Sequence, residues 1–459
     1  MTRRLSARET GLHVRLRRRA RPATIAGVFV TPPPTSSGPT ELLKTPESWL
    51  PNEHSLYRPR HSSRQRTALT CALAFFFVPV FLLVVGVRTE PFENRPLREF
   101  PGFGDGWSFF TGLSGWATDH LPLRQAGVNA ADGISTGVFG DPPGAAAGAQ
   151  DSTAGTPSTG RVPKGPQAYP QVIVGKDGWL YFGEDMHTRC EPVMDLDRVV
   201  TLLNRLRQAV EASGRRFELV FAPDKSTMKP AQLPDQYAGH DCAPPRTAEF
   251  WGKVPAATRA IDLRGALADT ERRLGRSVYV PNDTHWTFEA GLTMTYALAQ
   301  AITPGVTATW EAKESGIRSW PADLERLLGR PVDRTLRAYA LAPDGGADRT
   351  RYLASDFKTP LRLTQPDTPR GTITPNMAVV ADSFSQFASP FLAATCRDLT
   401  IVHTDTVAGG DDGTLKNLFE DRDVVVFEFV ERNVVGGSSG LLRDEAIDRL
   451  ARVLAQIPR

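Results

Sequence analysis

The residue types best suited to catalysis fall in two short clusters about a hundred positions apart. The first contains Asp283, His285 and Trp286, and the second contains Ser383 directly after Asp382. A serine hydroxyl is a weak nucleophile until a base removes its proton, and an imidazole serves as that base when a carboxylate fixes its tautomer. Asp283 and His285 are two positions apart, so both side chains can point the same way. If the two clusters face each other, they form a serine acyl-transfer centre.

Each cluster also fits an ordinary structural role. Asp283 can cap a turn while His285 lies on the surface, and Ser383 occupies a position typical of a helix N-cap. In the catalytic interpretation, the amide of Ser383 at the start of a helix helps to stabilise an oxyanion. The residue pattern by itself leaves both interpretations open.

The elements that must position these residues alternate between short apolar runs and amphipathic stretches. The runs predict a β-hairpin from 172–174 and 179–182 and strands at 217–222, 278–280, 377–381, 399–402 and 424–429. The amphipathic stretches predict helices at 195–212, 263–274, 288–302 and 443–457, with Thr287 as the N-cap of the third. This alternation predicts an α/β fold with a mostly parallel sheet covered on both faces. Both clusters then follow strand ends, at the sheet edge where active sites collect.

Composition divides the chain into parts with different physical character. We expect a disordered basic tail, a membrane anchor, a membrane-proximal segment, a flexible linker and a catalytic domain, at 1–66, 67–88, 89–137, 138–168 and 169–459. Within the last part, residues 305–375 interrupt the alternation and are interpreted as an insertion beside the site.

Charge and hydropathy predict how the chain lies across a membrane. Residues 1–66 carry thirteen Lys or Arg and four Glu, whereas the whole chain has a net charge of +3. Ala68–Val87 is an uncharged, mostly apolar run of about 20 residues, the length that spans a bilayer core. The arginines before this run place the N-terminus in the cytoplasm and the catalytic domain outside it, behind an uncleaved anchor. Anionic lipid accounts for the basic tail more simply than nucleic acid, so no nucleic-acid partner is expected.

Two cysteines of the exported part, Cys190 and Cys242, lie on polar stretches. An oxidising compartment permits a disulfide between them, which would close a loop of about 50 residues. With His187 and His240 they also provide two Cys and two His that could bind zinc, although the spacings are not those of a common zinc finger. We favour the disulfide.

The order of these motifs resembles the exported SGNH-hydrolase-like O-acetyltransferases of the AlgJ and AlgX type. The blocks that carry the resemblance are Glu93–Arg95 with Phe100 and Pro101, Asp119–Arg124, Val174–Tyr181, Pro223–Lys225, Asp283–Trp286 and Asp382–Phe384. Ala381 stands where the family usually has glycine, and only 76 residues follow Ser383, too few for a carbohydrate-binding module as well as the end of the sheet. The chain therefore resembles the membrane-anchored AlgJ form more than the AlgX form.

The resemblance implies a three-layer α/β/α fold in which Ser383 is the nucleophile, His285 the base and Asp283 its orienting partner. Four further residues are candidate substrate contacts: Trp286, Arg432, Lys225 and Tyr181. The implied reaction moves an acetyl group through a serine acyl-enzyme onto hydroxyls of an exopolysaccharide or cell-wall glycan. The acetyl donor would come from a membrane-bound O-acyltransferase partner, and no metal or cofactor is expected.

Two other functions fit the same sequence. An acetylesterase would use the same three residues with water as the acceptor. A cell-surface glycan-binding or assembly protein would keep the fold without the chemistry. None of the motifs specifies a sugar, so alginate itself does not follow from them.

Overall fold

The computed structural model describes residues 63–87, 99–102, 104, 106–122, 126–127, 130, 134 and 169–459 except 331 and 354. The basic tail up to residue 62 and the linker predicted at 138–168 lie outside the described residues.

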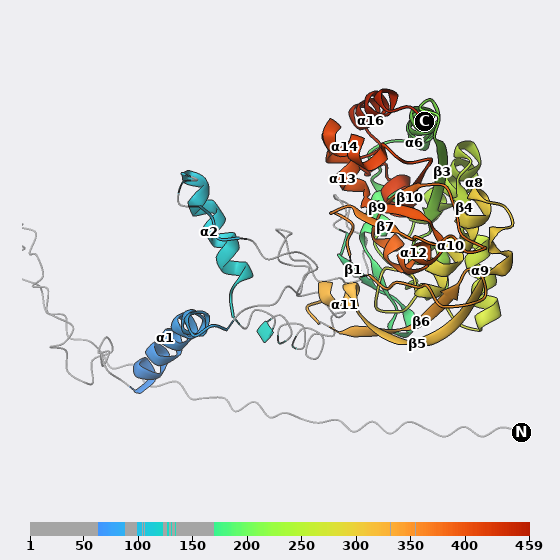
Figure 1. The fold of residues 1–459 in the computed structure, drawn as a ribbon. Helices are drawn as coiled ribbons and strands as arrows, with labels where there is room; N and C mark the ends of the chain where they lie inside the picture. The colour runs from blue at the N-terminus through green and yellow to red at the C-terminus, as the bar shows by residue number, and fades with distance from the viewer. Residues whose placement is uncertain are drawn as a thin grey trace, which may run out of the picture. The chain divides into compact units, whose positions relative to one another are not determined.

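Two helices, α1 and α2, precede the catalytic region in the chain (Figure 1). Helix α1, Ser63–Val84, contains the stretch Arg66–Val84, which is long and apolar enough to cross a membrane. Its side chains are exposed, with Phe75 at 75% and Phe81 at 63%. An apolar helix in which no residue of this stretch is buried fits a single transmembrane span. Helix α2, Trp107–Asp119, also exposes large aromatic side chains.

Six strands form the central sheet in the order β4-β3-β10-β8-β9-β7. Their bounds are β3 Arg216–Ala222, β4 Ile261–Asp262, β7 Leu361–Thr364, β8 Met377–Ala381, β9 Asp398–His403 and β10 Val424–Val430. All neighbours pair in parallel except β7, which lies antiparallel to β9. The predicted α/β fold with a mostly parallel sheet is therefore confirmed.

Both faces of this sheet are buried, because successive side chains of a strand point to opposite sides. In β8, Met377, Val379 and Ala381 contribute to one hydrophobic cluster, whereas Ala378 and Val380 contribute to the other. Helices α9 Arg264–Leu274, α10 Phe288–Ile302 and α12 Ser389–Thr395 supply the first cluster. Helices α6 Leu196–Glu211, α8 Ala243–Thr258, α14 Asp412–Phe419 and α16 Asp444–Gln456 supply the second. The result is a three-layer α/β/α domain (Figure 1).

The remaining elements are short or lie outside the sheet. They are β1 Val172–Val174, β2 Leu180–Phe182, α5 Glu184–Cys190, α7 Lys225–Met228, β5 Glu311–Pro321, α11 Asp323–Leu327, β6 Asp333–Ala342, α13 Thr404–Gly409 and α15 Glu431–Val435, with 3₁₀ segments η3 Lys176–Gly178, η4 Pro230–Gln232, η5 Val306–Thr309 and η6 Ser383–Phe387. β1 and β2 form the antiparallel hairpin expected from the sequence.

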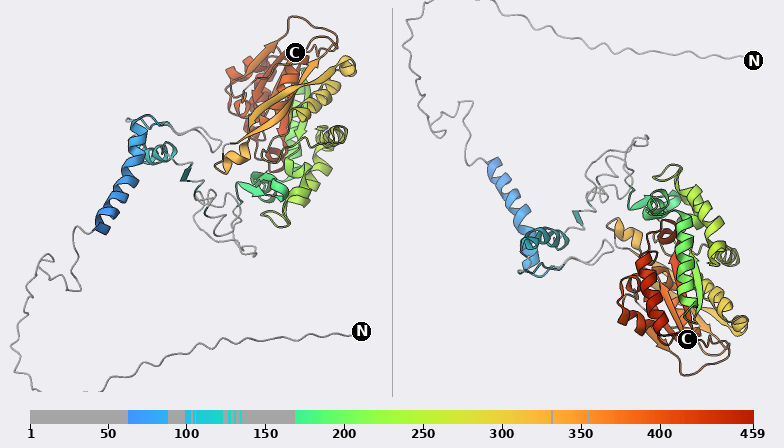
Figure 2. Two further views of the ribbon diagram at one scale, coloured as in Figure 1. Left: turned by 90° about the horizontal axis from the view of Figure 1, so that it is seen from below. Right: turned by 90° about the horizontal axis from the view of Figure 1, so that it is seen from above.

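The range predicted as an insertion, 305–375, holds a long antiparallel ribbon formed by β5 and β6 (Figure 2). Helix α11 lies between the two strands in the chain. The same range also contains β7, which extends the central sheet through β9. Part of the predicted insertion is thus an edge of the sheet.

The prediction of a strand at 278–280 is wrong. Tyr279 makes one isolated bridge with Trp286, and Thr287 N donates to Val278 O at 2.9 Å. The segment is a tight loop whose apolar side chains are buried, with Val278 at 0% and Tyr279 at 1% exposure. A short apolar run indicates burial, and periodicity cannot tell burial in a strand from burial in a loop. The parallel partner of β3 is instead the two-residue β4.

Candidate functional site

The structure brings the two chemical clusters into contact. Ser383 Oγ lies 2.7 Å from His285 Nε2, and His285 Nδ1 lies 2.8 Å from Asp283 Oδ1. The carboxylate also accepts the backbone N–H of His285 at 2.8 Å, so one oxygen holds both the ring and the backbone of the histidine. Ser383 begins η6, immediately beyond the carboxyl end of β8. These distances are those of a nucleophile, a base and an orienting carboxylate.

A tight loop holds the acid and the histidine, although no sheet strand precedes it. Leu180 N donates to Pro281 O at 2.8 Å, which fixes the loop to β2. The ammonium group of Lys225 donates to the carbonyl oxygens of Val280, Pro281 and Asp283 at 3.2, 2.9 and 2.7 Å. The loop therefore owes its position to main-chain and lysine hydrogen bonds.

The loop is also attached directly to the nucleophile segment. Trp286 Nε1 donates to Phe384 O at 2.9 Å. Helix α10 approaches η6 so closely that a Cβ added at Gly291 would lie 1.9 Å from Phe387 O. Since no side chain fits there, glycine permits the contact that keeps His285 beside Ser383.

A second carboxylate, Asp323, contacts the imidazole, and the sequence analysis did not identify it. Its Oδ2 lies 3.3 Å from His285 Nδ1. Its Oδ1 accepts the N–H of Thr284 at 2.8 Å, and its own N–H donates to Asp283 Oδ2 at 3.1 Å. Asp323 begins α11, immediately after β5, so the ribbon brings it to the site. Nothing in its sequence context distinguishes it from other acidic residues.

The two carboxylates determine the protonation of the histidine. Burial acts to lower the pKa of His285, but the charges and hydrogen bonds of Asp283 and Asp323 raise it to about 9. Burial acts to raise the pKa of Asp323, yet the hydrogen bonds and charge of His285, together with hydrogen bonds from Thr284, hold it well below its usual range. The imidazolium form is therefore strongly favoured at neutral pH.

A buried arginine balances this acidic pair. Arg334 Nε lies 3.3 Å from Asp283 Oδ2, and Arg334 is only 4% exposed. Its Nη1 donates to His285 O at 3.3 Å, and its guanidinium lies 4.9 Å from the centre of the Phe387 ring. A cation paired in this way offsets the cost of burying two carboxylates beside one histidine.

Asp283, His285 and Asp323 also form a group that could hold a metal ion, because their ligand atoms lie within 4.8 Å of one another. Those atoms already have partners. Asp283 accepts two N–H groups from His285 and Asp323, and Asp323 accepts the N–H and the hydroxyl of Thr284. The nearby guanidinium of Arg334 would repel a cation. The donors fit an imidazole held between two carboxylates better than they fit a metal ion.

The nucleophile segment is fixed from beneath by a buried acidic pair. Asp382 Oδ1 accepts the N–H of Phe384 at 3.1 Å, and its Oδ2 accepts the N–H of Val430. Glu428, fully buried in β10, accepts the N–H of Asp382 at 3.2 Å and the hydroxyl of Ser385 at 2.9 Å. Burial and the neighbouring charge of Asp382 raise the pKa of Glu428 well above its usual value. A neutral Glu428 lets both carboxyl groups share this interior position.

Three of the residues expected to contact substrate, Trp286, Tyr181 and Lys225, lie near the site but are buried. Trp286 and Tyr181 are 0% exposed, and Lys225 is 2% exposed. Tyr181 donates its hydroxyl to Lys229 O at 2.6 Å. Their polar atoms bind the backbone, so they position the catalytic loops and do not face a ligand.

Arg432 is likewise engaged within the protein. Its Nη1 donates to Asp224 Oδ1 at 2.7 Å and lies 3.6 Å from Asp185 Oδ1. The guanidinium lies 5.4 Å from the ring centre of Phe384, next to the nucleophile. Arg432, expected as a substrate contact, instead links α15 to Asp185 in α5 and to Asp224 after β3.

Cys190 and Cys242 form a disulfide, with a Cα–Cα distance of 5.2 Å. His187 contacts Glu184 and Glu191, and His240 contacts Asp241. Because both sulfurs are consumed in the covalent bond, the zinc alternative is excluded for these four residues. The disulfide links α5 to the start of α8.

Comparison with known proteins identifies the family of the domain. Residues 172–426 match the family model described as the SGNH hydrolase-like domain of the acetyltransferase AlgX. The probable alginate O-acetylase AlgJ of Pseudomonas fluorescens is 28% identical over 135 residues, which cover 29% of this chain and 34% of that protein. The corresponding protein of Pseudomonas putida is 23% identical over 194 residues, 39% of this chain and 47% of that protein.

The chain thus spans between a third and a half of the length of these curated relatives. Among solved structures, the O-acetyltransferase domain of Pseudomonas putida AlgJ is 18% identical with a TM-score of 0.40, covering 62% of this chain and 99% of that domain.

Proposed function

Because the chain belongs to the family of SGNH hydrolase-like domains of the AlgX acetyltransferase type, we propose that it is a serine-dependent O-acetyltransferase acting outside the cytoplasm. The single observation that carries the assignment of residues is the continuous contact from Ser383 Oγ through His285 to Asp283, at 2.7 and 2.8 Å. In this proposal Ser383 is the nucleophile, His285 the general base and Asp283 the carboxylate that orients it.

The first half-reaction loads the enzyme. Ser383 Oγ attacks the carbonyl carbon of an acetyl ester or thioester while its proton passes to His285 Nε2. The tetrahedral intermediate collapses, the bond to the donor breaks, and the leaving group takes the proton from His285. The acetyl group is then an ester on Ser383.

The second half-reaction reverses these roles with a new acceptor. A sugar hydroxyl gives its proton to His285 and attacks the acetyl carbon of the acyl-enzyme. When that intermediate collapses, Ser383 Oγ recovers the proton from His285, and the acetyl group leaves on the sugar. In both halves the imidazole becomes positively charged in the transition state, which Asp283 stabilises.

Asp323 acts in this proposal as a positioning residue. It faces Nδ1 of the same ring and adds a second negative charge to the side away from Ser383. The charge favours the imidazolium that forms during both half-reactions, at the expense of the neutral base in the resting enzyme. At neutral pH, less of His285 is therefore present as the neutral base, but the imidazolium that forms during the reaction is more stable.

The compartment and partners follow from the anchor and the chemistry. We place α1 across the membrane with the basic tail in the cytoplasm and the catalytic domain outside, where the disulfide between Cys190 and Cys242 is stable. Acetyl-CoA is cytoplasmic, so the donor requires a membrane-bound O-acyltransferase that delivers acetyl groups outside. The acceptor in this proposal is the hydroxyl of an exopolysaccharide or cell-wall glycan.

The test uses the full-length chain in detergent with an activated acetyl ester. We expect the wild type to gain one acetyl group on the peptide that contains Ser383, detected by mass spectrometry, and Ser383→Ala and His285→Ala to gain none. Ser319→Ala, an exposed serine of β5, serves as the matched control and should be labelled like the wild type. Labelling that survives Ser383→Ala contradicts the assignment.

A second measurement separates transferase from esterase. Polysaccharide acceptors are added to the labelled enzyme, and acetate and acetylated glycan are both quantified. Acetylated glycan formed in a Ser383-dependent manner supports the transferase. Free acetate as the product with every acceptor assigns the same residues to an acetylesterase.

A further inference from the structure

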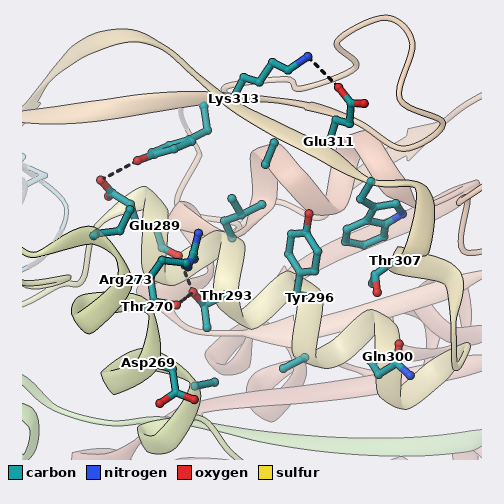
Figure 3. A pocket seen from close by; sticks show the side chains of 17 residues that line it. Asp269, Thr270, Arg273, Glu289, Thr293, Tyr296, Gln300, Thr307, Glu311 and Lys313 are labelled. Atoms are coloured by element: carbon teal, nitrogen blue, oxygen red, sulfur yellow. Dashed lines mark hydrogen bonds and ion pairs between the residues drawn. The ribbon is translucent and has the colours of Figure 1, made fainter.

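A groove of about 950 Å³ lies beside α10, and neither His285 nor Ser383 is among its lining residues (Figure 3). Its walls come from α9, α10, η5 and the start of β5. The volume is at the upper end of the range of about 300 to 1,000 Å³ typical of small-molecule sites. Nothing in the proposed acetyl transfer uses these side chains.

The floor of the groove is aromatic and fixed. The rings of Tyr296 and Trp310 meet edge to face with centroids 4.9 Å apart. Trp310 Nε1 donates to Gly371 O at 2.7 Å, which holds the indole in place. Leu292, one helical turn before Tyr296, extends the apolar surface. A ligand therefore meets a fixed apolar surface in which the two rings stand steeply to one another.

The rim of the groove carries polar groups that are only partly satisfied. Within the part of the chain that the structure describes, Arg273 forms no ion pair and the hydroxyl of Tyr296 forms no hydrogen bond. Glu289 accepts hydrogen bonds at Oε1 from Arg276 and Tyr339, but its buried Oε2 has no partner. Buried polar atoms are normally paired, so Glu289, which lines the groove, carries an incompletely satisfied acceptor that solvent does not reach in this structure.

Further hydroxyl and amide groups surround the same space. Thr270 and Thr293 contact each other through their hydroxyls at 2.9 Å. The side-chain oxygen of Gln300 accepts a hydrogen bond from Gly305 N at 3.1 Å. Figure 3 shows Arg273, Tyr296 and Gln300 arranged around one cavity beneath β5. The groove combines an aromatic, apolar floor with hydrogen-bond donors and acceptors at its edge.

We propose that this groove binds a segment of the acceptor glycan at a distance from the sugar that receives the acetyl group. A sugar ring has an apolar face of C–H groups and an edge of hydroxyls that both donate and accept hydrogen bonds. The face fits the rings of Tyr296 and Trp310, and the edge fits Arg273, Glu289 and Gln300. A lipid chain would leave these polar groups unsatisfied, which a buried carboxylate oxygen makes costly.

The elements of the groove are those that also form the catalytic site. Glu289 lies in the first turn of α10, four positions after His285, and Gln300 lies about 16 Å further along the helix axis. β5 leaves the groove at Glu311–Lys313 and ends at Pro321, two positions before Asp323. A glycan bound here would be recognised as a polymer, since a single sugar cannot occupy both places. This inference rests on the proposed acetyl transfer for its biological meaning, but its binding test does not.

The test measures binding by calorimetry with the full-length Ser383→Ala chain in detergent, so that no turnover occurs. The probes are two hexasaccharides, a neutral β-1,4-linked glucan and a β-1,4-linked uronate. We expect at least one to bind, Tyr296→Ala to weaken that binding about tenfold and Arg273→Ala about fivefold. Tyr296→Phe, which keeps the ring, should retain most of the affinity. Arg452→Ala, an exposed arginine of α16 that does not line the groove, is the matched control.

Kinetics with the active enzyme give an independent measurement. Tyr296→Ala should raise KM for the hexasaccharide acceptor and leave acetylation of Ser383 by a small acetyl ester unchanged. Arg273 is exposed on α9, so Arg273→Ala tests the groove even if Tyr296→Ala does not fold.

The two proposals fail in different ways. If neither hexasaccharide binds, or if both groove variants bind like the parent, the groove inference is overturned, while Ser383 acetylation by the small ester still supports the catalytic proposal. If hexasaccharide binding depends on Tyr296 and Arg273 but Ser383 is never acetylated, the groove stands and acetyl transfer falls.

Discussion

Replacing Asp323 with asparagine should move the pH dependence of catalysis without removing the base. Asp323→Asn keeps the shape of the side chain and its carbonyl acceptor for Thr284 N, but it removes one negative charge 3.3 Å from His285 Nδ1. His285 retains its contact with Asp283 at 2.8 Å, so its tautomer is unchanged. The pKa of His285 should therefore fall from its value of about 9.

The size of the fall follows from Coulomb's law. Two unit charges 3.3 Å apart interact by about 1.3 kcal/mol in a water-like dielectric and by about 5 kcal/mol at an effective constant of about 20. The side chains of His285 and Asp323 are 16% and 13% exposed, so solvent screens the pair only in part, and the interaction lies between these two figures, nearer the lower one. Since about 1.4 kcal/mol corresponds to one pKa unit, we expect a fall of about one to two units. The neutral imidazole at pH 7 then rises from about 1% to about 10% or more.

The assay is kcat/KM for a small acetyl ester between pH 5.5 and about 10. Because neutral His285 is the active base, the wild-type rate should rise with pH and level off above about 9. In Asp323→Asn the midpoint should lie about one to two units lower, with a plateau lowered modestly by the loss of imidazolium stabilisation. Asp283→Asn is the contrasting variant, since it removes the charge that stabilises the imidazolium and introduces an amide N–H that can favour the wrong tautomer of His285, and it should lower the plateau on the order of 10³-fold or more.

Two results would refute this reasoning. A midpoint that stays in place in Asp323→Asn, while the protein melts at the wild-type temperature, would mean that the second carboxylate does not act on His285. A plateau loss equal to that of Asp283→Asn would make Asp323 an orienting residue of the same rank as Asp283.

Three further predictions concern stability. The pKa of His285 is raised to about 9, above its unfolded value of about 6.5, so protonated His285 contributes roughly 3 kcal/mol to the free energy of unfolding. This contribution is fully present below pH 6.5 and is lost as the pH rises through about 9. The melting temperature should therefore fall over this interval, and it should fall less in His285→Gln. Lys225→Met leaves three carbonyl oxygens of the catalytic loop without their hydrogen-bond donor. It should destabilise the domain by about 3 kcal/mol, measured by denaturant unfolding. An unchanged unfolding midpoint would show that the lysine does not hold the loop. The Cys190→Ser, Cys242→Ser double variant opens a loop with a sequence separation of 52 and should lose about 4 kcal/mol, with reduction of the wild type as the comparison.

The parts of the fold that the sequence predicted well are those in which the information is local. The helix expected at 195–212 is α6, and its leucines recur on one buried face. The strands at β8 and β10 are unbroken apolar runs, as strands buried on both faces must be. In each case the pattern within a few residues reports the burial that the fold later provides.

The structure of the catalytic loop could not be predicted from the local sequence pattern. Val278–Val280 has the apolar character of a strand, but sheet membership depends on a partner, and β3 pairs with β4. The contact between His285 and Ser383 was predicted because the two clusters were chemically complementary. The route to that contact, through lysine and backbone hydrogen bonds of a loop, has no pattern in the sequence.

The charged residues around the site were the hardest to predict. Asp323 and Arg334 come from the ribbon range, whose sequence did not predict its elements, and they reach His285 and Asp283 only because β5 and β6 curve back to the site. Glu428 lies inside an apolar strand, and the sequence of that strand does not indicate that its carboxyl group contacts Asp382. Such contacts depend on tertiary geometry, which a single sequence does not display.

The ribbon formed by β5 and β6 makes the acidity of the site separable from the architecture of the domain. The nucleophile follows a strand of the central sheet, whereas the second carboxylate arrives on a ribbon outside that sheet. Although β6 packs into the core through Leu336, Tyr339 and Leu341, a change of charge at Asp323 alone would reset the pH at which the base is free. Homologous enzymes that share this sheet are free to diverge in working pH through this one hairpin.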